Sequence, residues 1–296
     1  MPEKDQPKLP SPQGEESSPP IKPKLNGKIV SHAEEGWVSQ VSYYENGQLH
    51  GETVIYSAKD VVLQKLHYKN GVMDGKYSTH DAEGKIKMEA FFKEKKLDGE
   101  MCVYGESGKV AERMLYKDGK LHGDSYFYNA EGNLIQKSHF IQGKLEGTAF
   151  LYEHDDVRSK VHYRNGKQDG ETISYSETGQ VIARMNYFAG KLNGESLFYS
   201  PEGKLMKKSL YRDQKLHGEN LEYYESGNLR ETCVYQNNKR EGELIRYDME
   251  GRLKEKLHYR EGKPYGDVIE YDEDGNIVSG EKKESRLKNF FKGLSQ

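Results

Sequence analysis

The stretch YKDGKLHGDSYFYNAEGNL, residues 116–134, contains the pattern that decides the fold. Its central glycine, Gly123, lies seven residues after Tyr116 and five residues before Tyr128. A second glycine, Gly132, follows Gly123 by nine residues, and Leu134 comes two residues later. The same positions recur up and down the chain, and a fixed period of this length is typical of repeat architectures.

The repeat is best followed through the residue that corresponds to Gly123, which we call the reference glycine of each unit. Successive reference glycines are 24 residues apart, with one interval of 23, and they are Gly27, Gly51, Gly75, Gly99, Gly123, Gly147, Gly170, Gly194, Gly218, Gly242 and Gly266. An aromatic residue lies seven positions before each of the last ten. Tyrosine lies five positions after nine of the eleven, with His32 and His80 as the exceptions. These two columns contain 17 of the 22 tyrosines.

Each unit is predicted to be one β-hairpin. In the unit that begins at Gly218, apolar and aromatic residues alternate at Leu221 and Tyr223 and again at Cys233 and Tyr235, and a period of two indicates strands. The segments between them are rich in Gly and Asn, which accept the positive φ of tight hairpin turns. Because a lone hairpin is marginally stable, we expect about eleven hairpins over residues 25–279 to join edge to edge. The predicted fold is an elongated, twisted antiparallel β-sheet.

The only break in the period falls near Asp155 and Asp156, which replace the usual glycine of the second turn. The repeat columns on both sides of this turn keep their usual spacing from their reference glycines. We therefore expect the missing residue of this 23-residue unit to have been lost from a turn.

The signature Y-x-x-G-K-x-x-G-x-x-x-x-Y-x-x-x-G-x-Leu, seen at residues 116–134, resembles the MORN repeat. It is most similar to the bacterial MORN variant of antitoxin-like, YwqK-type proteins. The resemblance implies an elongated antiparallel sheet and a role in protein interaction or membrane-proximal scaffolding, and the antitoxin label implies a toxin protein as partner. The usual MORN unit has 23 residues, whereas the unit of this chain has 24 and a longer second turn.

The two ends of the chain differ from the repeats. Seven of the nine prolines fall in the first 23 residues, so residues 1–24 are predicted to be a disordered tail. Residues 280–296 abandon the period of two and are predicted to form an amphipathic helix. Its apolar side is Leu287, Phe290, Phe291 and Leu294, and its basic residues are Arg286, Lys288 and Lys292. Three interpretations stay open: a cap over the last hairpin, a helix that docks on a membrane or partner, and a secretion signal.

Composition excludes several classes of function. The net charge is −3, which provides no field for nucleic acid and only weak contact with an anionic membrane. The sequence contains no nucleotide-binding glycine motif and no metal-ligand spacing of its two cysteines, so we expect no catalytic residue, no cofactor, no metal and no small-molecule substrate. Cys102 and Cys233 occupy aliphatic columns and are predicted to be small core residues. Because the sequence shows no apolar leader and no apolar span, a cytoplasmic protein is expected. Leaderless secretion and peripheral association with a membrane stay open as alternatives.

A charge pattern accompanies the repeat. Lysine stands three positions before the reference glycine in nine of eleven units, and an acid follows that glycine in eight. We expect the two columns to run side by side along one edge of the sheet, either as a solvated turn edge or as a periodic surface for a partner.

Two functions from different classes follow from these features. The first is a non-catalytic scaffold that binds an unidentified protein partner through an extended face of the β-ribbon. The second is a peripheral membrane adaptor that docks through the basic helix at residues 280–296. An antitoxin-like partner of a toxin protein is a further alternative, which only the family resemblance implies.

Overall fold

The computed structural model describes residues 24–279, and these form one antiparallel sheet of 24 strands. The strands are β1 Gly27–His32, β2 Val38–Glu45, β3 Gln48–Tyr56, β4 Val62–Lys69, β5 Val72–His80, β6 Ile86–Lys93, β7 Lys96–Tyr104, β8 Val110–Lys117, β9 Lys120–Leu121, β10 Gly123–Tyr128, β11 Leu134–Ile141, β12 Lys144–Leu145, β13 Gly147–Glu153, β14 Asp156–Arg164, β15 Lys167–Tyr175, β16 Val181–Phe188, β17 Lys191–Tyr199, β18 Leu205–Arg212, β19 Lys215–Tyr223, β20 Leu229–Gln236, β21 Lys239–Tyr247, β22 Leu253–Arg260, β23 Lys263–Tyr271 and β24 Ile277–Ser279.

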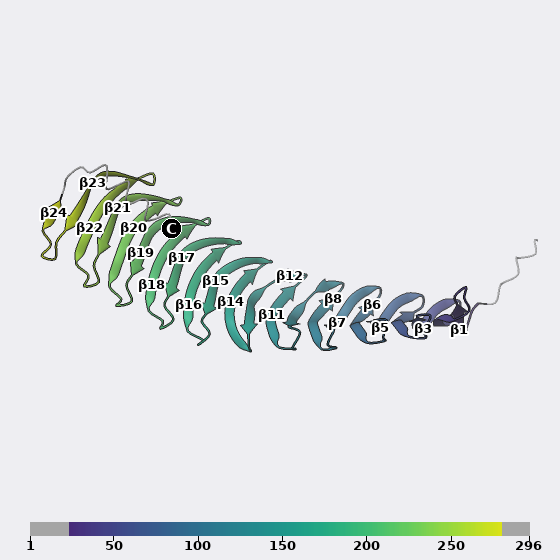
Figure 1. Cartoon of the computed structure of the whole chain (residues 1–296). Coiled ribbons are helices and arrows are strands. Elements are labelled where there is room, and N and C mark those ends of the chain that lie inside the picture. The colour runs from purple at the N-terminus through teal and green to yellow at the C-terminus, as the bar shows by residue number, and fades with distance from the viewer. Residues whose placement is uncertain (1–23, 280–296) are drawn as a thin grey trace, which may run out of the picture.

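Each strand pairs with its neighbours in chain order. Figure 1 shows the hairpins following one another along a curved, elongated ribbon, from the purple N-terminal end to the yellow C-terminal end. Strand β8 pairs with both β9 and β10, and β11 pairs with both β12 and β13. Because β9 and β12 are thus the first residues of interrupted strands, the 24 strands amount to eleven hairpins, as the sequence predicts.

Two kinds of turn alternate along the ribbon. The turn inside most units spans five residues and is closed by backbone bonds such as those from the N–H of Ser57 to the carbonyl of Val61, 2.8 Å. The turn between units has two residues, both with positive φ, as at Asn46 (φ 52°) and Gly47 (φ 80°). That conformation twists with the strands and explains the Asn-Gly and Asp-Gly pairs at these positions.

The shortened unit keeps the sheet intact by changing its turn. Glu153 pairs with Asp156, so only His154 and Asp155 remain in the turn, with φ 50° and 68°. This unit therefore uses the two-residue turn in place of the five-residue one, and the prediction of a deletion inside a turn is confirmed.

The reference glycine and the aromatic column meet across the strands. In ten hairpins the glycine lies directly opposite the aromatic residue, as with Gly123 and Phe140 or Gly218 and Tyr235. An aromatic ring can cover the bare backbone of a cross-strand glycine. The two columns of the repeat are thus one structural unit, which fixes the register of every hairpin.

The core is a row of one side chain per strand, two residues farther along from these pairs. Several members are small and fully covered, including Ala90, Ser125, Ser196 and Ser209, each 0% exposed. Both tyrosine-rich columns are half-buried, apart from the buried Tyr259. The column opposite the reference glycines flanks this row, whereas the column five residues after them lies on the other face, where the hydroxyl of Tyr104 donates to Glu89. A single curved sheet therefore makes its core from its own side chains.

The described residues contain strands and turns and no helix. The all-β prediction is confirmed for this part of the chain. The C-terminal helix predicted over residues 280–296 and the disordered tail predicted over residues 1–24 lie outside the described residues, apart from Lys24.

Candidate functional site: a charge ladder on the inner face

The two faces of the sheet differ in character. We call the face that carries the aromatic–glycine pairs and the covered row the inner face, and the opposite one the outer face. Side chains alternate between faces along each strand, so the residue before each cross-strand aromatic points outward. At that position Tyr43, Phe91, Leu115 and Val234 are 43%, 45%, 42% and 47% exposed. The inner face is thus the covered side.

Beside the covered row, the inner face carries another row that is mixed in its first part and fully charged in its last. Through β17 its apolar members, such as Ile55, Val103 and Phe127, face polar ones across the strands, here Gln64, Glu112 and Gln136. From β18 to β23 it is one charged residue per strand, a set that we call the charge ladder: Lys207, Glu222, Glu231, Arg246, Glu255 and Glu270.

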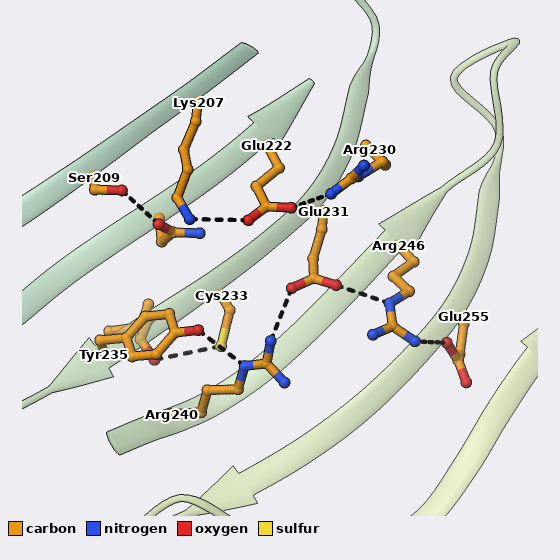
Figure 2. A network of polar contacts seen from close by, with 12 residues as sticks. Lys207, Ser209, Glu222, Arg230, Glu231, Cys233, Tyr235, Arg240, Arg246 and Glu255 are labelled. Atoms are coloured by element: carbon orange, nitrogen blue, oxygen red, sulfur yellow. Dashed lines mark hydrogen bonds and ion pairs between the residues drawn. The ribbon is translucent and has the colours of Figure 1, made fainter. Parts of the chain in front are cut away.

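Ion pairs within the charge ladder join Lys207 to Glu222 and Arg246 to both Glu231 and Glu255, as Figure 2 shows. Lys207 Nζ lies 3.2 Å from Glu222 Oε1. Arg246 donates from Nε to Glu231 and from a terminal nitrogen to Glu255, each bond 2.8 Å long. Glu222 also accepts a hydrogen bond from Arg230.

Arg240 reaches the charge ladder from the far side of the covered row, where it lies opposite Tyr235. Most units carry leucine two residues before the reference glycine, whereas this unit carries Arg240. Its Nε donates to the hydroxyl of Tyr235 at 3.0 Å, and a terminal nitrogen reaches Glu231 at 3.3 Å. Its guanidinium lies 5.4 Å from the ring centroid of Tyr259, a distance at which cation–π attraction operates.

These charges are substantially shielded from water. The side chains of Glu231, Glu255 and Arg246 are 12%, 16% and 23% exposed. A charge in such surroundings is costly unless it is paired. Burial alone would raise the pKa of Glu222, but hydrogen bonds from Arg230 and Lys207 lower it below its usual value of 4.5. Burial alone would lower the pKa of Arg240. The interactions with Tyr235 and Glu231 raise this pKa by more than burial lowers it, so it lies above its usual value.

The lowered pKa of Glu222 predicts an acid-sensitive contribution to stability. A carboxylate with a lower pKa in the folded state binds fewer protons there than in the unfolded state, so its stabilisation is complete above the unfolded value of about 4.5 and falls as the pH drops further. Urea unfolding between pH 6 and pH 3 should therefore show a shallower loss of stability in Glu222→Gln than in the parent chain. Identical dependence of stability on pH in the two proteins would contradict a lowered pKa of Glu222 in the folded state.

The outer face carries a different set of charges. Acids that follow the reference glycine pair with bases on the next strand: Glu100 with Arg113 at 2.7 Å and Glu195 with Lys208 at 2.6 Å. The expectation that these acids run beside the lysine column was wrong, and no ion pair joins those two columns within residues 24–279. The reason is distance, because the lysine stands four residues earlier on the same strand, roughly 13 Å away.

The structure places the other predicted residues as follows. Cys233 is 1% exposed within a cluster with Leu244, Leu257 and Tyr259, so its assignment to the core is confirmed. Cys102 is only partly covered. The docking residues predicted in the C-terminal segment all lie outside the described residues, namely Arg286, Leu287, Lys288, Phe290, Phe291, Lys292 and Leu294.

Sequence reasoning missed the charge ladder, although a signal was present. The column four residues after the reference glycine contains Val103, Phe127 and Leu151 in the middle units and Glu222, Arg246 and Glu270 in the last three. The repeat is recognised from the columns in which its units carry the same residues. The change from apolar to charged residues appears only when a variable column is followed from unit to unit.

Within the described part of the chain, no group of three or more His, Cys, Asp or Glu residues is arranged to hold a metal ion. The same residues include no helix of the length and apolar character needed to cross a bilayer.

Comparisons with known proteins give one family and distant structural likenesses. The model of the MORN repeat variant matches seven segments, residues 39–54, 73–94, 97–118, 121–142, 168–188, 192–213 and 216–237. No curated protein matches the chain. A crystal structure of TcdB2-TccC3-Cdc42 is 14% identical over 81% of this chain, with a TM-score of 0.20. A structure of the Photorhabdus luminescens Tc holotoxin pore is 13% identical over 83%, with a TM-score of 0.19. The alignments cover only 16% of each of those chains, and at such scores they say nothing of fold or function here.

Proposed function

This chain belongs to the MORN repeat variant family, and we propose on that basis that it is a non-catalytic scaffold that binds a protein partner along the inner face of its sheet. MORN repeats are generally repeats for protein or membrane interaction, and the family is a non-enzymatic one. Membrane interaction would depend on residues 280–296. Protein interaction can use the charged and apolar side chains that the repeats themselves place on the inner face.

The charge ladder is the observation that carries the proposal. Earlier units form the same hairpins with an uncharged pair at this place, such as Ile55 with Gln64 or Phe127 with Gln136, so the fold does not require ion pairs there. Replacing shielded ion pairs by apolar residues of similar volume is often neutral or stabilising. A row of charges that the fold could do without is better explained by recognition, because charged groups exclude partners that lack complementary ones.

The partner's chemistry follows from the two zones of this row. Between β3 and β17 it offers partly covered apolar side chains such as Val103 and Phe127, with polar side chains on the facing strands, and from β18 onward it offers both signs of charge. The most accessible charges are Lys207 and Arg230, 40% and 52% exposed. We therefore infer an elongated protein partner with an apolar segment followed by a segment that carries acidic groups. A polyanion fits less well, since Glu231 and Glu255 would repel it.

The test uses a variant that restores the usual residues of the repeat. We call Glu231→Gln, Arg240→Leu, Arg246→Phe and Glu255→Gln together the repeat-matched variant, because Gln136, Leu216 and Phe198 occupy the corresponding positions elsewhere. The repeat-matched variant should fold and keep its hairpins, because each introduced residue type already occupies the corresponding position in another hairpin. Quantitative affinity purification with the full chain should then show a partner whose recovery falls about tenfold or more.

The matched control removes charge from the outer face instead. Glu195→Gln with Lys208→Gln breaks a 2.6 Å ion pair of similar kind, and partner recovery should stay at the level of the parent chain. A repeat-matched variant that is folded, by circular dichroism, and retains every partner would overturn the assignment to the inner face.

A further inference from the structure

One hairpin departs from the repeat in several columns at once, on the outer face. In β5 and β6 the residue after the reference glycine is Lys76 and not an acid, and the opposing base is replaced by Glu89. His80 occupies the tyrosine column. Ser78 occupies a column that is otherwise larger, with Val54 one unit earlier and Cys102 one unit later. These side chains come from adjacent strands, so their departures are concentrated in one place.

The departures open a cavity. Its volume is about 390 Å³, and its lining includes Lys65 and His67 from β4 together with Ser78 and His80 from β5. Cavities that hold small molecules start at about 300 Å³. The short side chain of Ser78, itself 4% exposed, provides part of this space, because the corresponding positions carry bulkier groups.

Two of the lining charges neutralise each other. Lys76 forms an ion pair with Glu89, and the hydroxyl of Tyr104 donates to the same carboxylate at 2.9 Å. This pair is the reverse of the acid–base order found in four other hairpins, such as the one with Glu195 and Lys208. It leaves the remaining lining groups to determine what the cavity attracts.

Those remaining groups are mainly donors without partners. Lys65 forms no ion pair within residues 24–279, whereas Arg113 and Lys208, at the same position of other units, pair at 2.7 and 2.6 Å. In the same part of the chain, His80 Nδ1 is buried without a hydrogen-bond partner. With the Ser78 hydroxyl and the His67 ring, one ammonium, one hydroxyl and two imidazoles line the same space.

We propose that this cavity binds a small molecule through a single anionic group, a phosphate or a carboxylate. An ammonium combined with neutral donors is a common arrangement for such a group, since charge-assisted hydrogen bonds are the strong ones. The carboxylate of Glu52, also in the lining, would accept a hydrogen bond from a hydroxyl or amino group of the same molecule. This site is on the outer face and does not depend on the scaffold function proposed above.

The experiment is a titration of the full chain with inorganic phosphate, and separately with acetate, at constant ionic strength. The imidazole signals of His67 and His80 in NMR spectra should move and saturate, and the relative response to the two anions identifies which group the site prefers. Lys65→Ala should weaken binding about tenfold, the usual effect of losing one charged hydrogen bond. His80→Tyr, which restores the residue of the column, should fill the cavity and abolish binding while the chain stays folded.

Two controls make the result decisive. Lys208→Ala removes the corresponding lysine from another unit, and His32→Tyr restores the column at its other exception, so both should leave binding unchanged. Signals that fail to saturate with either anion, or equal weakening by Lys208→Ala, would overturn the proposal. Binding that persists in a folded His80→Tyr chain would do the same.

Discussion

Replacing Gly99 by alanine should destabilise the middle of the ribbon by about 4 kcal/mol, a large effect for a single added methyl group. Gly99 has φ +125°, where residues with a side chain rarely lie, and such strain costs on the order of 1–3 kcal/mol. The added Cβ would also lie 3.0 Å from Cβ of Phe91. That atom is attached to the backbone and cannot rotate away, so crowding adds about 1–3 kcal/mol more.

Hydrogen exchange measured by mass spectrometry can localise this effect. In a repeat array each unit contacts only its neighbours, so protection should fall mainly in β6 to β8, by roughly a thousandfold. Protection in β20 to β22 should remain at the parent level. Equal loss along the whole ribbon would mean that the array unfolds as one cooperative unit and would contradict a local effect.

Gly147 provides the matched control. It occupies the same column, but its φ is +75° and an added Cβ would meet nothing within 4 Å. Gly147→Ala should therefore cost only about 1–2 kcal/mol, the penalty for a left-handed residue with a side chain. If both substitutions cost the same, the close contact with Phe91 contributes nothing to the requirement for glycine.

The two glycines show how far sequence reasoning reaches. Their spacing predicts the register and the hairpins, because each unit repeats the evidence for the same pairing. The sequence does not distinguish Gly99 from Gly147, since φ depends on the local course of each strand. The column accordingly contains open positions, such as Gly242, and crowded ones, such as Gly218 beside Leu210.

The candidate site was less predictable than the fold for a related reason. A periodic pattern reports what all units need, whereas a site arises where a few units differ. Glu231, Arg240 and Arg246 look like ordinary surface charges in the sequence, and only the cross-strand register brings them together. Cys233 could be assigned to the core because its column carries small or apolar residues in other units. The docking residues proposed for the C-terminal segment remain a prediction.

Replacing Glu231 by alanine is the second substitution with a large expected effect. This carboxylate is shared by two guanidinium groups, with Arg246 at 2.8 Å and Arg240 at 3.3 Å. Removing one partner of a shielded ion pair leaves charge poorly compensated and typically costs 3–5 kcal/mol. Because the two arginine side chains keep 23% and 25% exposure, we expect about 3 kcal/mol, measured by hydrogen exchange in β20 to β22.

The comparison with the outer face and with the repeat-matched variant separates charge from packing. Glu195→Ala breaks a pair whose side chains are 38% and 33% exposed, and exposed pairs contribute about 0–1 kcal/mol. The repeat-matched variant loses Glu231 as well, yet it also removes both arginines that need it, so protection in β20 to β22 should return to the parent level or above. If that variant is as unstable as Glu231→Ala, the charge ladder is itself a source of stability. A return to parent protection together with loss of the partner would mean that these charges serve recognition and that the hairpins can fold without them.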